Sequence, residues 1–312
     1  MKCCVFGGNG FIGSAVVDRL LRDGHAVRVF ERPWLKRYRD FLPEESVEWV
    51  TGDFMNAHDV GEALDGTDVV LHLVSSTLPK TSNDDPVNDV QSNLVPTLRM
   101  LETMVTHGVR KVIFISSGGT VYGSPMYLPI DEMHPTNPHV SYGITKLTIE
   151  KYLLLFEKIH GIKTTILRVA NPFGERQRPE YAQGAVGVFL HRALLQQAIE
   201  IWGDGSVTRD FIYIEDVADA FAKAVQYSGS KNVFNIGSGA GTQLNGLIKI
   251  IEEILGKPIE RRYQPARPFD VPVSVLSNAL AREELKWAPE VSLRDGIART
   301  VKWMNKELGG SK

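Results

Sequence analysis

The stretch Lys2–Gly13, with the sequence KCCVFGGNGFIG, decides the fold of this 312-residue chain. Its first part, Lys2–Phe6, is short, apolar and β-branched, which is typical of a buried strand. The glycines that follow are Gly7, Gly10 and Gly13. A helix is predicted directly afterwards over Phe11–Arg22, and a second strand over Ala26–Phe30. The stretch therefore predicts a β-α-β unit whose turn is built from glycine.

The glycine spacing inside this unit indicates a dinucleotide-binding turn. Glycine permits the tight turn, lets the backbone approach a pyrophosphate and lets the helix pack closely on the strand. The phosphates would lie against the N–H groups at the helix N-terminus, next to Phe11 and Ile12. A purely structural glycine turn is the alternative. The strand before the turn, the helix after it and an acid at the end of the second strand favour the nucleotide.

That acid is Glu31. A carboxylate at this place accepts hydrogen bonds from an adenosine ribose and repels a 2′-phosphate, which favours NAD over NADP. Arg32 follows directly and could accommodate that phosphate, so the residues alone leave NADP open. Asp53, after the third predicted strand, is a candidate for contacting the adenine, or it caps the turn before Asn56.

Composition indicates a soluble globular chain. Hydrophobic residues make up 43% and charged residues 23%, and the net charge is −2, so we expect neither nucleic acid nor an acidic membrane as partner. Cys3 and Cys4 are neighbours in a predicted strand and point to opposite faces, which indicates buried thiols and neither a disulfide nor a metal site. No apolar run reaches the roughly 20 residues of a membrane helix, and no signal peptide precedes the first strand, so we expect a cytoplasmic protein.

Further strands alternate with helices along the first half of the chain. They are predicted at Val47–Val50, Asp68–Leu73, Lys111–Ile115 and Lys163–Arg168. This alternation predicts a doubly wound parallel sheet, in which ligands bind at the carboxyl ends of the strands. Hydroxyl side chains lie at those ends, at Ser75, Ser116, Ser117 and Thr120.

Tyr142 and Lys146 are four residues apart in a predicted helix, Tyr142–His160, and therefore share one helix face. An ammonium beside a phenol favours the phenolate, which brings tyrosine within range of general-base chemistry. A solvated helix face with an ordinary tyrosine and lysine gives the same pattern. The nucleotide-binding unit elsewhere in the chain favours the catalytic interpretation.

From about Gln177 the loops lengthen and proline and glycine recur. We expect helices at Gly184–Ala198, Ile214–Tyr227 and Leu244–Leu255, and short strands near Glu200–Trp202 and Asn232–Asn235. Two loops of this half carry arginines, Arg209 and Arg267, that could hold a diphosphate in bidentate fashion. The alternative for each is an ion pair with a neighbouring acid, such as Arg209 with Asp210.

Taken together, these residues resemble the extended short-chain dehydrogenase/reductases, in the branch of nucleotide-sugar epimerases and dehydratases. The resemblance covers the chain from Met1 to about Leu308, with the motifs in the order and spacing of that family. Its carriers are Gly7–Gly13, Gly52-Asp53, Asn93, Thr120–Gly123, Tyr142–Lys146, Asn171–Gly174, Arg209–Tyr213 and Arg267–Pro272.

The resemblance implies a Rossmann-type doubly wound parallel sheet with a smaller C-terminal α/β substrate domain. It implies an NAD-binding domain over 1–170, with returning segments from about 205–240, and a substrate-binding domain mostly over 171–312. It also implies residues that bind NAD. They are Gly7, Gly10, Phe11, Ile12, Gly13, Glu31, Arg32, Asp53, Phe54, Leu73, Ser75, Asn93, Ser116, Tyr142 and Lys146.

The resemblance further implies a reaction. Lys146 would bind the nicotinamide ribose and lower the pKa of Tyr142, and Tyr142 would take the proton from the sugar 4-hydroxyl during oxidation at C4. NAD would be retained and regenerated, as in the 4-epimerases of UDP-sugars. The residues implied for the nucleotide-sugar substrate are Thr120, Asn171, Arg209, Arg267, Asp270 and Ser274. A homodimer, formed by two long helices over 93–107 and 142–160, is implied as well, although core packing within one subunit explains the same apolar pattern.

Two positions depart from the pattern of the family. Members carry a serine or threonine that binds the sugar 4-hydroxyl where this chain has Gly118. Thr120 is the better replacement than Ser117, which lies one residue early and should face differently. Ser274 stands where some relatives have a bulky residue, so we expect room for an N-acetyl group, unless a displaced loop turns Ser274 to solvent.

Three other functions remain open at this stage. A 4,6-dehydratase would need an Asp-Glu pair where this chain has Gly119 and Thr120, which argues against dehydration. A reductase that consumes NAD(P)H stays open because of Arg32. A non-catalytic NAD-binding module is disfavoured by the intact Tyr142 and Lys146 and mildly favoured by Gly118.

Overall fold

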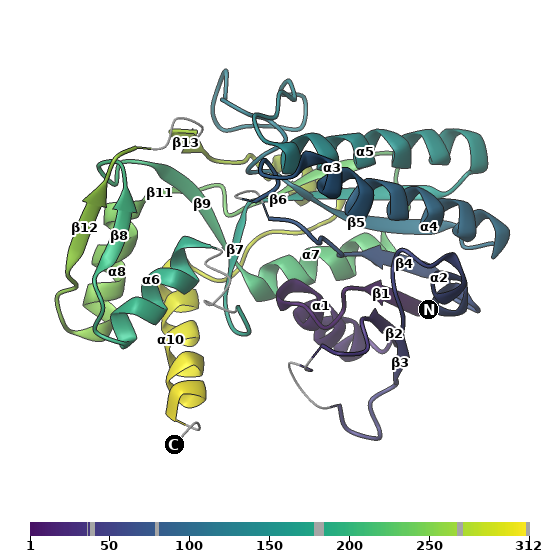
Figure 1. Cartoon of the computed structure of the whole chain (residues 1–312), viewed down its shortest axis with the longest axis horizontal. Coiled ribbons are helices and arrows are strands. Elements are labelled where there is room, and N and C mark those ends of the chain that lie inside the picture. Colours follow the sequence, from purple (N-terminus) through teal and green to yellow (C-terminus); the bar gives the residue numbers. More distant parts are fainter. Residues whose placement is uncertain (36, 38–40, 79–80, 178–183, 267–270, 310–312) are drawn as a thin grey trace.

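Parallel strands in the order β10-β6-β5-β4-β1-β2-β3 form the central sheet of the computed structural model (Figure 1). The structure describes residues 1–35, 37, 41–78, 81–177, 184–266 and 271–309. The strands are β1 (Lys2–Phe6), β2 (Ala26–Glu31), β3 (Val47–Thr51), β4 (Val69–His72), β5 (Lys111–Ser117), β6 (Lys163–Val169) and β10 (Val233–Ile236). The strand order reverses between β1 and β4, and ligands of such sheets bind outside the carboxyl ends at this point.

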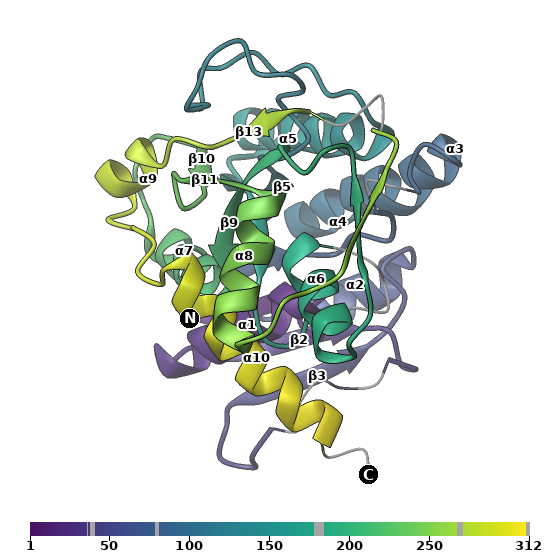
Figure 2. The same ribbon diagram turned by 90° about the vertical axis from the view of Figure 1, so that its left-hand side faces the viewer.

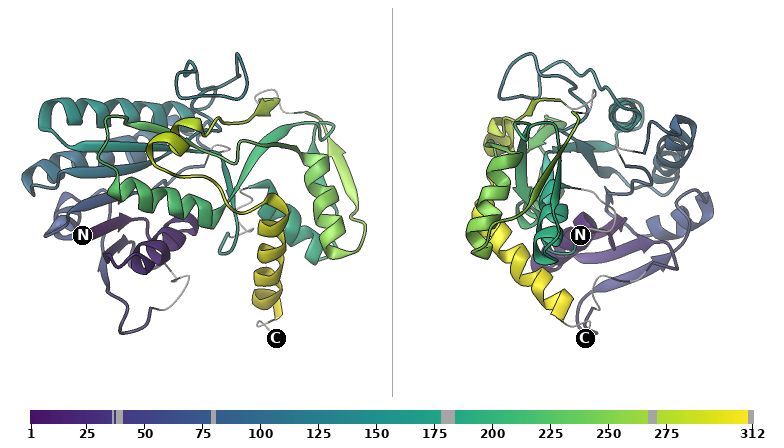
Figure 3. Two further views of the ribbon diagram at one scale, coloured as in Figure 1. Left: turned by 180° about the vertical axis from the view of Figure 1, so that it is seen from behind. Right: turned by 60° about the vertical axis from the view of Figure 1, so that its left-hand side comes forward.

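Helices cover both faces of the sheet (Figures 1 and 3). One face carries α1 (Phe11–Arg22) and α7 (Ile214–Gln226). The other carries α2 (Ala57–Leu64), α3 (Pro86–Asp89), the π-helical turn η1 (Val90–Leu94), α4 (Val95–Thr106) and α5 (Ser141–His160). Cys3 faces the first layer and Cys4 the second, and both thiols are free and buried, as the alternation of strand residues predicts.

The C-terminal part lies to one side of the sheet, and Figure 2 shows it facing the viewer. Its strands are β7 (Asn171–Phe173), β8 (Ile199–Trp202), β9 (Thr208–Tyr213), β11 (Gly241–Gln243), β12 (Arg261–Gln264) and β13 (Val273–Ser274). Its helices are α6 (Ala185–Leu194), α8 (Leu244–Leu255), α9 (Ala279–Glu284) and α10 (Leu293–Gly309). A single apolar cluster runs from β1 and α1 through α7 into α6, α8 and β8, so this part packs on the sheet without a polar gap.

The doubly wound parallel sheet is confirmed. One expectation for the C-terminal part is wrong, because Arg209 lies in strand β9 and not in a loop. The segment Thr208–Tyr213 is held as a strand from both sides, since it pairs with β11, β13 and β7. The elements α3, η1 and α4 form one continuous helical stretch that ends at Thr106. Within it, the five residues of η1 form a π-helical turn shortly before Pro96. Such turns recur at functional sites. The domain boundaries stay a prediction.

Candidate active site

The turn after β1 has the geometry of an anion-binding loop. Gly7 has a φ of 82°, where a side chain is strained, and a Cβ at Gly13 would overlap the carbonyl oxygen of Gly7. Helix α1 can approach the strand this closely only because Gly13 has no side chain. No side chain caps the first turn of α1, and that turn contains no acid. Its N–H groups and the positive end of the helix dipole therefore suit a pyrophosphate.

Glu31 ends strand β2 beside this turn. Its carboxylate accepts hydrogen bonds from the backbone N–H groups of Arg32 and Asn9, and burial raises its pKa. A small hollow begins here, and its lining residues are Phe30, Glu31, Arg32, Gly52, Asp53, Phe54, Met55, Val74 and Ser92. Four residues predicted to contact the cofactor therefore lie together, in a place that suits the adenosine. Asp53 is exposed, and its carboxylate also accepts from the N–H of Met55 at 3.0 Å, which is the turn-capping alternative.

The structure places Tyr142 and Lys146 in the first two turns of α5, at the carboxyl edge of the sheet. Lys146 is 4% exposed, and its ammonium donates to the carbonyl of Ile115 at 3.1 Å and lies 4.7 Å from the centre of the Phe114 ring. Burial lowers the pKa of Lys146 to about 8. A lysine this close to neutral pH is a functional candidate.

The expected lowering of the Tyr142 pKa by Lys146 is wrong for this structure. Burial raises the pKa of Tyr142 to about 12, a hydrogen bond with Ser75 lowers it and the charge of Asp89 raises it further. The ammonium lies 5.6 Å from the centre of the Tyr142 ring and donates to a carbonyl oxygen, and burial sets the direction of the Tyr142 shift.

Thr120 is brought next to Tyr142 by a glycine. A Cβ at Gly143 would lie 2.8 Å from the carbonyl oxygen of Thr120, so the loop can approach α5 only because Gly143 lacks a side chain. The Oγ1 of Thr120 is buried and has no hydrogen-bond partner among the described residues. A buried hydroxyl without a partner is costly, and at this place it suits a ligand. Leu73 and Val74, the two residues after β4, lie directly against Gly7.

Gly118 is explained by Leu276. A Cβ at Gly118 would overlap Cδ1 of Leu276, which is fully buried and follows strand β13. Leu276 is fixed in turn, because its backbone N–H donates to the carboxylate of Asp210. The space of the usual serine is therefore occupied by a leucine from the C-terminal part of the chain.

A buried ion pair joins α5 to strand β6. Arg168 on β6 bonds Glu150 on α5 at 2.6 and 3.0 Å, and both side chains are nearly inaccessible. The hydroxyl of Ser116 donates to the same carboxylate. Because the Ser116 side chain is committed to this pair, any contact with the cofactor would come from its backbone. Tyr122 continues the network, since Arg168 donates to its hydroxyl at 2.9 Å.

Sequence reasoning missed Asp89, the last residue of α3. Its carboxylate is fully buried and accepts hydrogen bonds from Thr77, Asn93, Ser141 and Thr145. The predicted cofactor residue Asn93 belongs to this cluster, because its amide also donates to Thr77 and its Oδ1 accepts from the N–H of Ser76 at 2.9 Å. Asp89 lies among polar residues at the start of a helix, and nothing in that stretch of sequence predicts that its side chain is buried.

The residues predicted to bind substrate meet on β7, β9 and β13. Asn171 donates to the carbonyl of Asp210 at 2.9 Å, and Arg209 donates to the carbonyls of Thr208 and Val271. The carboxylate of Asp210 accepts from Ser238, Gly239 and Leu276. Ser274 pairs with Arg209 in the sheet and is buried, so the alternative that it faces solvent is wrong. Arg267 and Asp270 lie outside the described residues.

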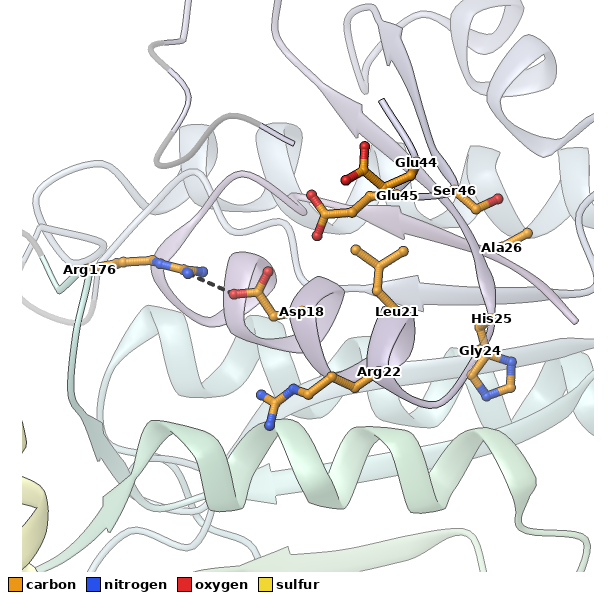
Figure 4. A pocket seen from close by; sticks show the side chains of 10 residues that line it. All are labelled: Asp18, Leu21, Arg22, Gly24, His25, Ala26, Glu44, Glu45, Ser46 and Arg176. Atoms are coloured by element: carbon orange, nitrogen blue, oxygen red, sulfur yellow. Dashed lines mark ion pairs between the residues drawn. The ribbon is translucent and has the colours of Figure 1, made fainter. Parts of the chain in front are cut away.

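A second hollow lies elsewhere on the molecule (Figure 4). It lies between the end of α1 and the segment before β3, and is lined by residues such as Leu21, His25 and Glu45. Arg176 forms an ion pair with Asp18 at 2.7 Å at its rim. This is the amino end of strand β2, and ligands of parallel sheets bind at the carboxyl ends.

Within the described residues, no helix has the length and apolarity needed to cross a membrane.

Comparisons with known proteins agree with this geometry. Residues 3–237 match the sequence profile of the NAD-dependent epimerase/dehydratase family. A UDP-glucose 4-epimerase of Mycolicibacterium smegmatis is 37% identical over 311 residues, which is 98% of this chain and 99% of the relative. The crystal structure of a UDP-glucose 4-epimerase from Thermotoga maritima with UDP-glucose has a TM-score of 0.93 and 36% identity, covering 99% of this chain and all of that one. A UDP-glucose 4-epimerase from Thermus thermophilus in complex with NAD has a TM-score of 0.89 and 32% identity, covering 98% of this chain and 99% of that chain.

The contact between Gly118 and Leu276 predicts a coupled effect on stability. Gly118→Ser should lower the free energy of unfolding by about 1–3 kcal/mol, because the new side chain overpacks against Leu276. Chemical denaturation measures this. Gly119→Ser is the matched control, since a Cβ there meets no atom within 4 Å. In the double variant Gly118→Ser with Leu276→Ala, the total loss of unfolding free energy should be smaller than the sum of the losses in the two single variants. Equal effects at positions 118 and 119 would contradict the assignment.

Proposed function

The chain belongs to the NAD-dependent epimerase/dehydratase family, and on that premise we propose that it is a nucleotide-sugar 4-epimerase. The substrate is a UDP-hexose or a UDP-N-acetylhexosamine, oxidised transiently at C4 and reduced again on the other face. The observation that carries the proposal is the close contact of the Thr120 loop with α5 at Gly143, between Tyr142 and Lys146 in the sequence, together with a Thr120 hydroxyl that has no partner among the described residues.

The residues around the glycine turn fit NAD. Gly7, Gly10 and Gly13, with the N–H groups of Phe11 and Ile12, would hold the pyrophosphate, and Glu31 would accept from the adenosine ribose. Asp53 and Phe54 would flank the adenine in the hollow that they share with Arg32. When bound, NAD supplies a hydride acceptor and a positively charged ring, and such a charge favours the ionised form of a nearby phenol.

Tyr142 would move the proton of the sugar 4-hydroxyl. Its raised pKa keeps the phenol protonated, so in this state Tyr142 can return a proton, and it becomes the base that removes one only when the positive charge of bound NAD favours the phenolate. Lys146 would hold the nicotinamide ribose, and Ser75 would orient the phenol through their hydrogen bond. Thr120 would bind the 4-hydroxyl against Tyr142. Ser117 remains a secondary candidate at the end of β5.

The C-terminal part would bind the nucleotide sugar. We propose that residues 1–170, with segments from about 205–240, hold NAD, and that 171–312 hold most of the substrate. The return of β10 to the central sheet beside β6 supports this division. Asn171 and Arg209 would contact the diphosphate, and Ser274 would leave room for an N-acetyl group. Arg267 at the diphosphate and Asp270 at the nucleotide ribose remain predictions from the sequence.

Other reactions of the family are supported less well. A dehydratase needs an acid and a base beside the active hydroxyl, and Gly119 and Thr120 occupy those places. A one-way reductase would consume a nicotinamide for each product. A binding module without catalysis would leave the low pKa of Lys146 and the unpartnered Thr120 hydroxyl without a role.

A screen of UDP-sugars on the purified protein tests the proposal. We expect UDP-glucose or UDP-N-acetylglucosamine to give the 4-epimer without net consumption of NAD. Tyr142→Phe should reduce turnover at least a hundredfold and leave NAD binding intact, because only the proton-transfer group is removed. Product stereochemistry by NMR measures the first result. Turnover that survives in Tyr142→Phe would sink the assignment, and no activity on the acetylated sugar would remove the role of Ser274.

The two hydroxyl candidates can be separated by single substitutions. Thr120→Ala should lower kcat by about a hundredfold, because it removes the group that binds the 4-hydroxyl in the transition state. Ser117→Ala should have a smaller effect. The pair is matched, since each change removes one hydroxyl, from the last residue of β5 or from the loop that follows it. Near-wild-type rates for both variants would show that neither side chain binds the 4-hydroxyl.

We also propose a homodimer that forms through the two long helical stretches, namely α5 and the continuous stretch of α3, η1 and α4. Several apolar residues of these stretches are buried or partly buried against the core of their own subunit: Leu94, Leu98, Leu101, Val105, Leu147 and Leu154. A different set on the outer face remains exposed, namely Val87, Val90, Ile144, Leu155 and Ile159. A cytoplasmic location, in which free thiols persist, remains our expectation.

The outer face of α5 gives the test of the dimer. The double substitution of Leu155 and Ile159 by glutamate should convert the dimer to a monomer, because it places charges in an apolar interface. Leu42→Glu, at another exposed leucine, is the control. Light scattering after size-exclusion chromatography measures the mass. A wild-type monomer, or a dimer that both changes leave intact, would contradict this interface.

A further inference from the structure

Asp89 is a fully buried carboxylate whose two oxygens contact different parts of the chain. Oδ1 accepts from the hydroxyl of Thr77 and from the amide of Asn93 at 3.1 Å. Oδ2 accepts from the hydroxyls of Ser141 and Thr145, each at 2.8 Å. Burying a carboxylate costs several kcal/mol unless it is well hydrogen-bonded, and these four donors satisfy it. One side of the carboxylate thus binds the segment after β4, and the other binds α5.

The partners of Asp89 surround Tyr142. Ser141 precedes Tyr142 and Thr145 lies one turn later, so Oδ2 fixes the part of α5 that carries the phenol. On the other side, the carbonyl of Thr77 accepts from Ser75 at 3.1 Å, and Ser75 is hydrogen-bonded to Tyr142. The phenol is therefore held between two segments that meet on one carboxylate.

The same segment completes the start of α5. No side chain of its own residues caps this helix. The N–H of Ser141 donates to Asn83 at 2.8 Å, and the N–H of Tyr142 donates to Ser82 at 3.0 Å. Two of the N–H groups that a helix start leaves without partners are thus bound by the segment after Thr77. The hydroxyl of Thr77 itself donates to Asp89. The residues that cap α5 therefore belong to a segment that the carboxylate of Asp89 also holds.

We propose that Asp89 is a positioning residue for the reaction, which joins the Ser75–Thr77 segment to the first turns of α5 and so fixes the hydroxyl of Tyr142. This inference rests on the proposed function, because only a reaction at Tyr142 gives its position a catalytic consequence. Asp89 touches neither the sugar nor the cofactor in this role. It acts through Ser75, Ser141 and Thr145.

Electrostatics supplies a readout that a merely structural residue would not change. On α5 itself, the ammonium of Lys146 lies 5.6 Å from the centre of the Tyr142 ring, and the carboxylate of Asp89 acts on Tyr142 from α3. The charge of Glu150 also raises the pKa of Lys146. The negative charge of Asp89 raises the pKa of both Tyr142 and Lys146. Replacing it by a neutral amide therefore lowers both pKa values, and the acid limb of the kcat profile moves to lower pH.

Asp89→Asn is the first variant to measure. We expect kcat to fall about tenfold to a hundredfold, because the phenol loses its fixed position. The KM for the nucleotide sugar should stay within about twofold, and the acid limb should shift to lower pH. Asp216→Asn is the matched control. Asp216 lies on helix α7, is also a buried carboxylate, and accepts hydrogen bonds from the backbone N–H groups of Glu290 and Val291. This variant should lose stability without a shift of the pH profile. An unshifted profile with wild-type kcat for Asp89→Asn would overturn the proposal.

Two isosteric changes keep the test informative if Asp89→Asn does not fold. Thr77→Val removes the donor to Oδ1, and Thr145→Val removes a donor to Oδ2. Each should lower kcat, and the double variant should lose little more than the worse single variant, because either change breaks the same connection. Effects that multiply, or no effect at all, would contradict a shared role.

Amide hydrogen exchange separates this inference from the proposed function. The N–H groups of Ser141 and Tyr142 should exchange faster in Asp89→Asn than in the wild-type protein, and should be unchanged in Asp216→Asn. A wild-type protein that turns over no nucleotide sugar would refute the proposed function. An active wild type whose Asp89→Asn variant keeps its exchange rates and its pH profile would refute this inference alone.

Discussion

Close approach of backbone to backbone, permitted only by glycine, is the constraint on which the site depends. Gly13 lets α1 contact the carbonyl of Gly7, and this contact directs the start of the helix at the position of a pyrophosphate. Gly143 lets the loop of Thr120 contact α5 beside Tyr142. A methyl group at either place would separate the elements whose ends form the cofactor site and the catalytic site. The sheet order then places both sites at the same edge, because the strand order reverses between β1 and β4.

Burial of polar groups gives this edge its chemistry. Lys146 is enclosed by the ring of Phe114 and the end of β5, and its pKa falls to about 8. Tyr142 is buried in the same region, and its pKa rises. Behind them, Glu150 and Arg168 neutralise one another, so α5 carries a hydrogen-bonded acid one turn beyond Lys146 without leaving a lone charge in the core. Burial therefore shifts the pKa values of these two groups in opposite directions, away from one another, and such a separation is typical of acid–base pairs.

The sequence was sufficient to predict the doubly wound sheet, because apolar strands, glycine turns and helix periodicity are local signals. The same is true of Tyr142 and Lys146, whose spacing fixes one helix face. The direction of the Tyr142 pKa could not be predicted, because it depends on how deeply the phenol is buried and on Asp89, which is distant in the sequence. Gly118 was recognised as a departure, but its cause is Leu276, which the fold brings from the other half of the chain. Arg209 was placed in a loop because β9 is recognisable only with its three partner strands.

The central claim is that the protein inverts C4 of a nucleotide sugar by removing and returning the same hydride. A UDP-hexose that carries deuterium at C4 tests it directly. Mass spectrometry and NMR of the product should show the 4-epimer with the deuterium still at C4, and the nicotinamide content of the protein should be unchanged after many turnovers. Deuterium released to water, or one reduced nicotinamide formed or consumed for each product, would contradict the account.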